Sequence, residues 1–114
     1  PPARRRYFAP ESFPAAKAPG TFRIFCLGES TVQGHPYSKE TSFTAWLQLG
    51  LTEADAARRW EVINCGGVSY ASYRLAPILR ECLNYKPDLF ILAIGHNEFL
   101  EDRTYGPLKR EWFP

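Results

Sequence analysis

Three short polar stretches contain the residue types that could do chemistry in this chain. Residues 28–31 (Gly-Glu-Ser-Thr) offer Ser30, whose hydroxyl could act as a nucleophile beside a base and oxyanion donors. Residues 64–70 contain two adjacent glycines, whose turn can expose backbone N–H groups to an anion. Residues 95–98 (Gly-His-Asn-Glu) offer Asn97, whose amide can donate to a developing oxyanion. Each stretch alone also fits an ordinary turn, so the chemistry depends on their being brought together.

The apolar pattern predicts the elements that would position these stretches. Short apolar runs at 22–27, 61–65 and 89–94 predict buried strands, and the last, as the most apolar, is expected to be the most central. Helical spacing of apolar residues predicts two helices between the strands, over 43–54 and 75–83. Strands that alternate with helices favour βαβ units, so the sequence predicts an α/β fold with a parallel sheet.

The predicted sheet gives the polar stretches a common location. Ligands of such sheets bind beyond the carboxyl ends of the strands, and each polar stretch begins where a strand ends. We therefore expect Ser30, the backbone donors of the Gly-Gly turn and Asn97 at one edge of one sheet. In the first helix, we expect Phe43 and Trp46 to lie in the core.

The order and spacing of the stretches resemble those of the SGNH/GDSL hydrolases. Residues 28–31 are similar to that family's Gly-Asp-Ser-Leu block, and residues 95–98 to its Gly-x-Asn-Asp/Glu block. Residues 62–67 are similar to the second block, and the resemblance covers about residues 21–104. It implies a three-layer α/β/α flavodoxin-like parallel sheet, here with only the first three strands and their helices. It also implies a serine ester hydrolase of the esterase, lipase or acylhydrolase type.

The resemblance also implies roles for single residues. Ser30 would be the nucleophile, and its own backbone N–H, a second backbone N–H and the Asn97 amide would form the oxyanion hole. The family's second-block glycine falls at the position of Ser69, whereas the glycines here come earlier, so either Gly67 or Ser69 could supply the second N–H.

Residues beside these blocks are candidates for binding the substrate. Glu29 precedes the nucleophile where the family usually has aspartate, His96 stands inside the third block, and Tyr70 follows the glycine turn. The implied ligand is a small-molecule, carbohydrate or lipid ester. No cofactor and no metal are expected. Members of the family are often secreted or attached to the cell envelope, so the resemblance favours such a location.

The family's catalytic Asp-x-x-His block has no counterpart in the chain. The residues three places after the aspartates are Arg58, Ile91 and Tyr105. We therefore expect the N-terminal half of such a domain, whose partner is the remainder of its own domain, with little or no turnover by itself. His35, in the loop after Ser30, is a weaker candidate for the base.

The composition of the chain argues against several other classes of protein. The 114 residues carry a formal net charge of only +2, which argues against a nucleic-acid or membrane-surface protein. The longest apolar run, 89–94, is too short to span a bilayer. Residues 1–20 hold five of the ten prolines and are expected to form a linker or arm, with the domain over 21–114. The three cysteines form no CxxC pair and are expected to be small buried apolar residues.

Two rival functions use the same predicted fold. A non-catalytic module could hold an acyl or acetylated-sugar ligand at the strand ends without cleaving it. A nucleotide-binding or receiver-type domain also fits the element order, but the chain has no glycine-rich phosphate loop and no acidic pair after the first strand.

Overall fold

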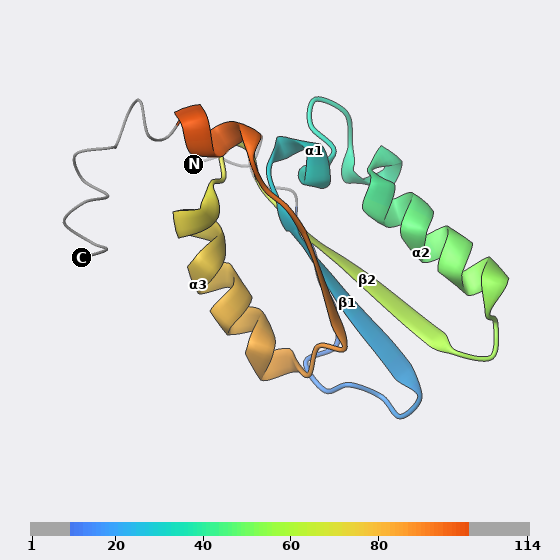
Figure 1. Ribbon diagram of the computed structural model, residues 1–114. Helices are drawn as coiled ribbons and strands as arrows, with labels where there is room; N and C mark the ends of the chain where they lie inside the picture. Colours follow the sequence, from blue (N-terminus) through green and yellow to red (C-terminus); the bar gives the residue numbers. More distant parts are fainter. Residues whose placement is uncertain (1–9, 101–114) are drawn as a thin grey trace.

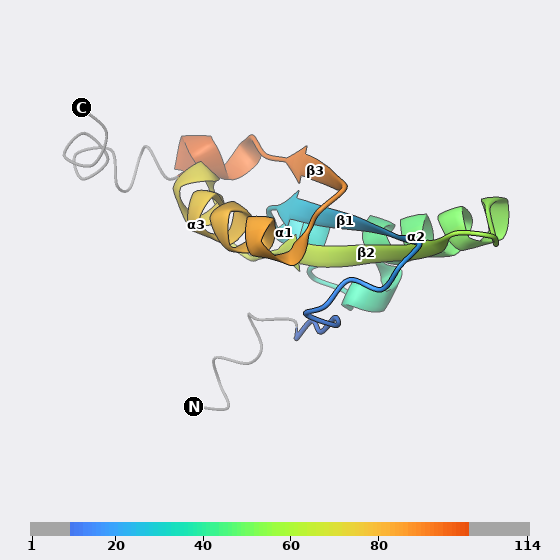
Figure 2. The same cartoon turned by 90° about the horizontal axis from the view of Figure 1, so that it is seen from below.

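A three-stranded parallel sheet forms the centre of the molecule in a computed structural model that describes residues 10–100. β1 (Thr21–Gly28) is the middle strand, and it pairs with β2 (Arg59–Gly66) on one side and β3 (Leu89–Ala93) on the other. The sheet is seen nearly edge-on in Figure 1 and from below in Figure 2. The predicted parallel α/β fold is confirmed, and the described part is an α/β flavodoxin-like fragment.

Helices cover both faces of the sheet. α1 (Ser30–Gln33) and α2 (Phe43–Ala54) lie on one face, and α3 (Ser72–Cys82) lies on the other (Figure 1). Two short 3-10 turns, η2 (Lys39–Thr41) and η3 (Leu83–Tyr85), precede α2 and follow α3. This arrangement gives the three layers that a doubly wound sheet requires.

The core is divided between the two faces of β1. Phe25 and Leu27 point towards α3 and are fully buried, whereas Ile24 and Cys26 point towards α1 and α2. Burial of one large apolar side chain is worth about 1.5–3 kcal/mol, so the central strand contributes strongly to stability. Burial also raises the pKa of the Cys26 thiol to about 11, so this cysteine stays neutral.

The prediction that residues 89–94 form the most central strand is wrong for the described chain. β3 is an edge strand, and Leu89, Leu92 and Ile94, which follows the strand, are 45%, 51% and 42% exposed. Apolar content alone did not separate an edge strand from the middle strand. β1 takes the centre because β2 and β3 both pair with it.

The prediction that Phe43 and Trp46 lie in the core is also wrong, since they are 41% and 66% exposed. The physical reason lies on the other side of α2. The Gln48 amide donates to the carbonyl of Trp60 at 2.9 Å and accepts the N–H of Val62 at 2.7 Å. These bonds satisfy two backbone groups of β2 and hold Gln48 against the sheet, on the side of α2 where Leu51 packs against the core, so Phe43 and Trp46 face outward.

The segment at residues 10–20 contains no helix or strand but is anchored to the sheet. The Phe13 ring packs edge-on against Phe25 and Tyr85, at centroid distances of 5.4 and 5.3 Å. The buried guanidinium of Arg23 donates to the Pro14 carbonyl at 2.8 Å. Packing therefore extends into the segment for which a linker or arm was predicted. Residues 1–9 and 101–114 of the predicted arm and domain lie outside the described residues.

Candidate functional site

Three loops follow the three strands at one edge of the sheet. The last residue of β1, Gly28, pairs with Gly66 of β2 and Ala93 of β3, so the strands end at the same level. We call residues 28–31 the first loop, residues 66–71 the second loop and residues 94–98 the third loop. The parallel register thus brings the predicted polar stretches to one edge, as expected for a ligand site.

The first loop presents Ser30 directly after the sheet. The backbone carbonyl of Glu29 accepts the N–H groups of Val32 and Gln33 at 3.0 and 3.2 Å, which starts α1 with Ser30 as its first residue. Ser30 is partly exposed. A side chain at Gly28 would come within 2.4 Å of the Ala93 carbonyl oxygen, so glycine allows β1 and β3 to approach closely where they end.

The second loop is fixed to the first by a backbone bond. The N–H of Gly67 donates to the Gly28 carbonyl at 3.1 Å, and the Tyr70 ring covers the glycine so closely that a Cβ would lie 2.5 Å from it. Ser69 is exposed and has a φ of 61°, a left-handed conformation that glycine adopts most easily. Within residues 10–100, the N–H of Gly67 is therefore already donated to a backbone carbonyl, whereas that of Ser69 has no backbone acceptor.

The third loop is bound to both of the others. The carboxylate of Glu29 accepts the N–H groups of Gly95 and Asn97 at 2.8 and 2.9 Å. The Asn97 amide, only 7% exposed, donates to the Tyr70 carbonyl at 2.8 Å. These bonds preorganise the edge, because each of the three loops holds another in place.

A further contact joins the third loop to α3. The carboxylate of Glu98 accepts the backbone N–H of Ser72 and, at 3.0 Å, its hydroxyl. Ala71 is the N-cap of α3 and offers no side-chain acceptor, so Glu98 supplies the cap from the neighbouring loop.

Asn64 supports the site, although the sequence analysis gave it no role of its own. Its amide nitrogen lies 2.7 Å from the Val32 carbonyl and 3.0 Å from the Thr44 hydroxyl, and its oxygen accepts the N–H of Gly66 at 3.0 Å. One side chain thus joins α1, α2 and the end of β2. The available signal was an asparagine near the end of a strand, two positions before a pair of glycines.

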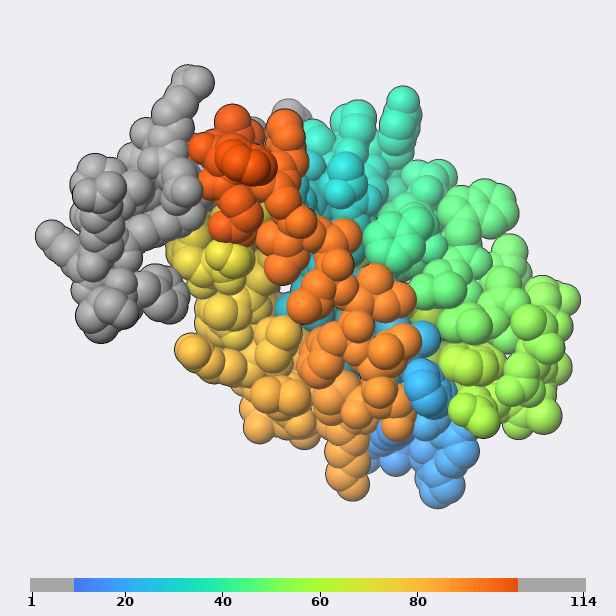
Figure 3. Space-filling model, in the orientation of Figure 1, coloured from blue at the N-terminus to red at the C-terminus, as the bar shows by residue number. Residues whose placement is uncertain are grey.

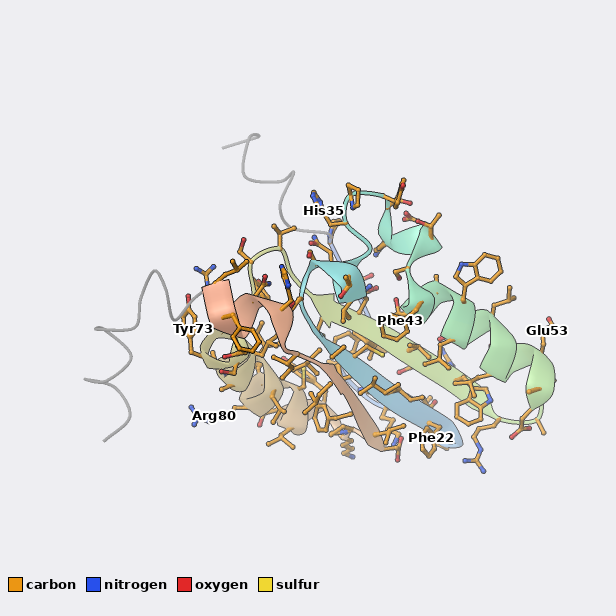
Figure 4. The ribbon with its side chains drawn as sticks, turned by 45° about the horizontal axis from the view of Figure 1, so that its top comes forward. Phe22, His35, Phe43, Glu53, Tyr73 and Arg80 are labelled. Carbon is orange, nitrogen blue, oxygen red and sulfur yellow. The ribbon has the colours of Figure 1, made fainter. Side chains whose placement is uncertain are left out.

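The imidazole rings of the two histidines take no part in the hydrogen bonds that join the three loops within residues 10–100. His35 is exposed on the loop that follows α1, as Figure 4 shows, and His96 is exposed between the two residues held by Glu29. Within the described range 10–100 neither imidazole ring forms a hydrogen bond with the Ser30 hydroxyl, although the backbone N–H of His35 donates to the Ser30 carbonyl at 2.9 Å. The base predicted to be missing is therefore not supplied by a preformed serine–histidine pair there.

A cysteine stands at the same edge but is a poor nucleophile. Cys65 is the residue before Gly66, and burial raises the pKa of its thiol well above the usual range, with the neighbouring Cys82 thiol adding to the effect. The thiolate is the reactive form of cysteine, so this shift suppresses reaction at Cys65. Ser30, which is partly exposed at the start of α1, remains the nucleophile that the sequence predicts.

No protein-family model matches the sequence, and no curated protein matches it at a significant level. Within residues 10–100, no group of three or more His, Cys, Asp or Glu side chains could hold a metal ion. None of the helices in that range is both long and apolar enough to cross a membrane.

Proposed function

We propose that this chain provides the nucleophile and the oxyanion donors of a serine ester hydrolase. The observation that carries the proposal is the joining of three strand-end loops, so that Ser30 and the buried amide of Asn97 belong to one hydrogen-bonded unit. Preorganised donors of this kind are the largest contribution to acyl transfer in many hydrolases. The resemblance of the same three loops to the SGNH/GDSL blocks supports this function.

In the proposed reaction, the Ser30 hydroxyl attacks the carbonyl carbon of an ester and its proton passes to a base. The carbonyl oxygen becomes an oxyanion, which accepts hydrogen bonds from the second N–H of the Asn97 amide and from a backbone N–H of the second loop. We assign that backbone donor to Ser69, because the Gly67 N–H is already donated to the Gly28 carbonyl. Collapse of the intermediate expels the alcohol and leaves an acyl group on Ser30.

We assign the base to a further strand and helix of the same domain, bound at the free edge of β3. The exposed Leu89, Leu92 and Ile94 support this assignment, because edge strands of folded proteins are normally blunted by charge or covered. Figure 3 shows β3 in orange on the visible surface of the molecule. A strand added there would extend the sheet in the direction away from β2.

Rescue by imidazole tests the proposed function in the chain as it stands. Hydrolysis of p-nitrophenyl acetate is followed with increasing imidazole, which can replace an absent histidine side chain. We expect an imidazole-dependent rate above that of imidazole alone, lost in Ser30→Ala and kept in Ser12→Ala, whose serine is exposed on the N-terminal segment. Equal rates for Ser30→Ala and the unmodified chain would contradict the proposal.

A second candidate function is a binding module for acyl or acetylated-sugar ligands. It is favoured by one observation, the lack of an imidazole ring hydrogen-bonded to the Ser30 hydroxyl within residues 10–100. This candidate predicts that an acetylated sugar shifts the amide resonances of the three loops while no acyl group reaches Ser30. The hydrolase predicts acylation of Ser30 by an activated ester.

A further inference from the structure

We infer that Glu29 is a positioning residue that links the nucleophile to the oxyanion donor, and that it does not bind the substrate. The inference rests on the proposed function and departs from the substrate-binding role implied by the sequence. Glu29 is only 5% exposed, although ionised carboxylates are almost never buried unless they are paired. In the described range, no lysine, arginine or histidine forms an ion pair with it.

Backbone N–H groups take the place of a cation. Glu29 Oε1 accepts the N–H of Gly95 at 2.8 Å and that of Asn97 at 2.9 Å, so the third loop closes around the carboxylate. Successive backbone N–H groups that converge in this way form an anion-binding concavity. Here the bound anion is a side chain of the protein itself, which leaves that oxygen engaged before any substrate arrives.

The same residue also fixes the nucleophile. The backbone carbonyl of Glu29 starts α1 by accepting the N–H groups of Val32 and Gln33, and this turn sets the position of Ser30. Its side chain sets the backbone from which the Asn97 amide projects. Glu29 therefore determines how the attacking oxygen and the oxyanion donor are placed relative to each other, by contacts that exist without substrate.

Amide hydrogen exchange in the whole chain tests this inference directly. Glu29→Met keeps the approximate volume of the buried side chain but removes the acceptor, whereas Glu29→Gln keeps a carbonyl oxygen. We expect exchange at Gly95 and Asn97 to be about tenfold or more faster in Glu29→Met, as for loss of a charge-assisted bond. Glu29→Gln and Glu53→Ala, an exposed carboxylate on α2 labelled in Figure 4, should match the unmodified chain.

Two exchange results would overturn the inference. In one, Glu29→Met and Glu29→Gln give the same rate at Asn97. In the other, exchange in Glu29→Met rises equally along β1, which would mean that Glu29 supports the whole fold and not the loop.

Acylation of Ser30 by p-nitrophenyl acetate separates this inference from the proposed function. We expect the rate constant for acylation to fall about a hundredfold in Glu29→Met, the usual cost of a displaced oxyanion donor, and to return with glutamine. If the unmodified chain is acylated at Ser30 but Glu29→Met exchanges normally at Asn97, the positioning role is wrong and the hydrolase stands. If exchange responds as expected but Ser30 is never acylated, the catalytic link is overturned together with the hydrolase.

Discussion

Replacing Arg23 should destabilise the protein more than any surface substitution. Its guanidinium is fully buried and donates to the Glu61 carboxylate at 2.8 Å, to the Tyr85 carbonyl at 2.7 Å and to the Pro14 carbonyl at 2.8 Å. It also lies 5.1 Å from the centre of the Phe13 ring. One side chain thus joins β1 to β2, to the end of η3 and to the N-terminal segment.

The magnitude follows from what Arg23→Met leaves behind. Removing one partner of a buried ion pair costs about 3–5 kcal/mol, because the other charge stays buried without compensation. Glu61 keeps 13% exposure and has Arg59 at 4.0 Å, which moderates the cost for the carboxylate. The two carbonyl groups lose their donors as well. We therefore expect a loss of about 3 kcal/mol, a large part of the 5–15 kcal/mol that is typical of a domain.

Urea unfolding followed by circular dichroism measures this loss. The matched control is Arg80→Met on the exposed side of α3 (Figure 4), for which we expect a change within about 0.5 kcal/mol. Arg23→Lys should fall between the two, because an ammonium group keeps the charge but cannot reach all three acceptors with a rigid fork. A loss below about 1 kcal/mol for Arg23→Met would refute the argument that this group anchors the segment.

Three further predictions concern other parts of the fold. Gly66→Ala should destabilise the fold, because the added Cβ would lie 2.4 Å from the Gln33 nitrogen. Gly50→Ala should stabilise the fold by about 0.5–1 kcal/mol, because the added Cβ meets open space in α2. The midpoints of urea unfolding measure both changes. We expect the exposed β3 edge to pair between copies of this chain, and Leu92→Lys should reduce that self-association in analytical ultracentrifugation at unchanged stability. The Lys17 ammonium and then the Arg23 N–H lower the pKa of Asp88, so the stability it adds is present at neutral pH and is lost as pH falls through that lowered pKa. Asp88→Asn should flatten the acid limb of the stability profile.

The strands and helices could be predicted from the sequence because their apolar patterns are strong. The helix predicted over 43–54 is α2, and the strand predicted over 89–94 ends one residue earlier as β3. The helix predicted to begin near residue 75 begins at Ser72 and includes Pro77 within it. Its first turn contains no apolar stripe to mark it, and its cap comes from Glu98 in a distant loop.

The exposure of α2 could not be read from spacing. Phe43 and Trp46 lie at helical intervals that fit a buried stripe, but the amide of Gln48 bonds the edge of β2 and leaves these two side chains exposed, while Leu51 packs against the core. A polar residue that satisfies a strand edge competes with apolar burial for the orientation of a helix. The periodicity of apolar residues does not detect a hydrogen bond from a polar side chain to a strand edge.

The site could be predicted in part. Strand ends and glycine turns placed Ser30 and Asn97 at one edge, since the rule for parallel sheets depends only on element order. The contact between Glu29 and Asn97 spans 68 positions of the chain, so no local pattern indicates it. The proposed choice of Ser69 over Gly67 likewise rests on a backbone hydrogen bond, which the sequence does not show.

The most direct test of the proposed nucleophile and oxyanion donors is to identify which residue of the chain becomes acylated. The chain is treated with p-nitrophenyl acetate in imidazole buffer, digested and analysed by mass spectrometry, with Asn97→Ala and Ser30→Ala in parallel. We predict an acetyl group on Ser30 of the unmodified chain, about a hundredfold less in Asn97→Ala, and none at that position in Ser30→Ala. Acetylation confined to lysines and tyrosines, with Ser30 unlabelled in the unmodified chain, would contradict the account.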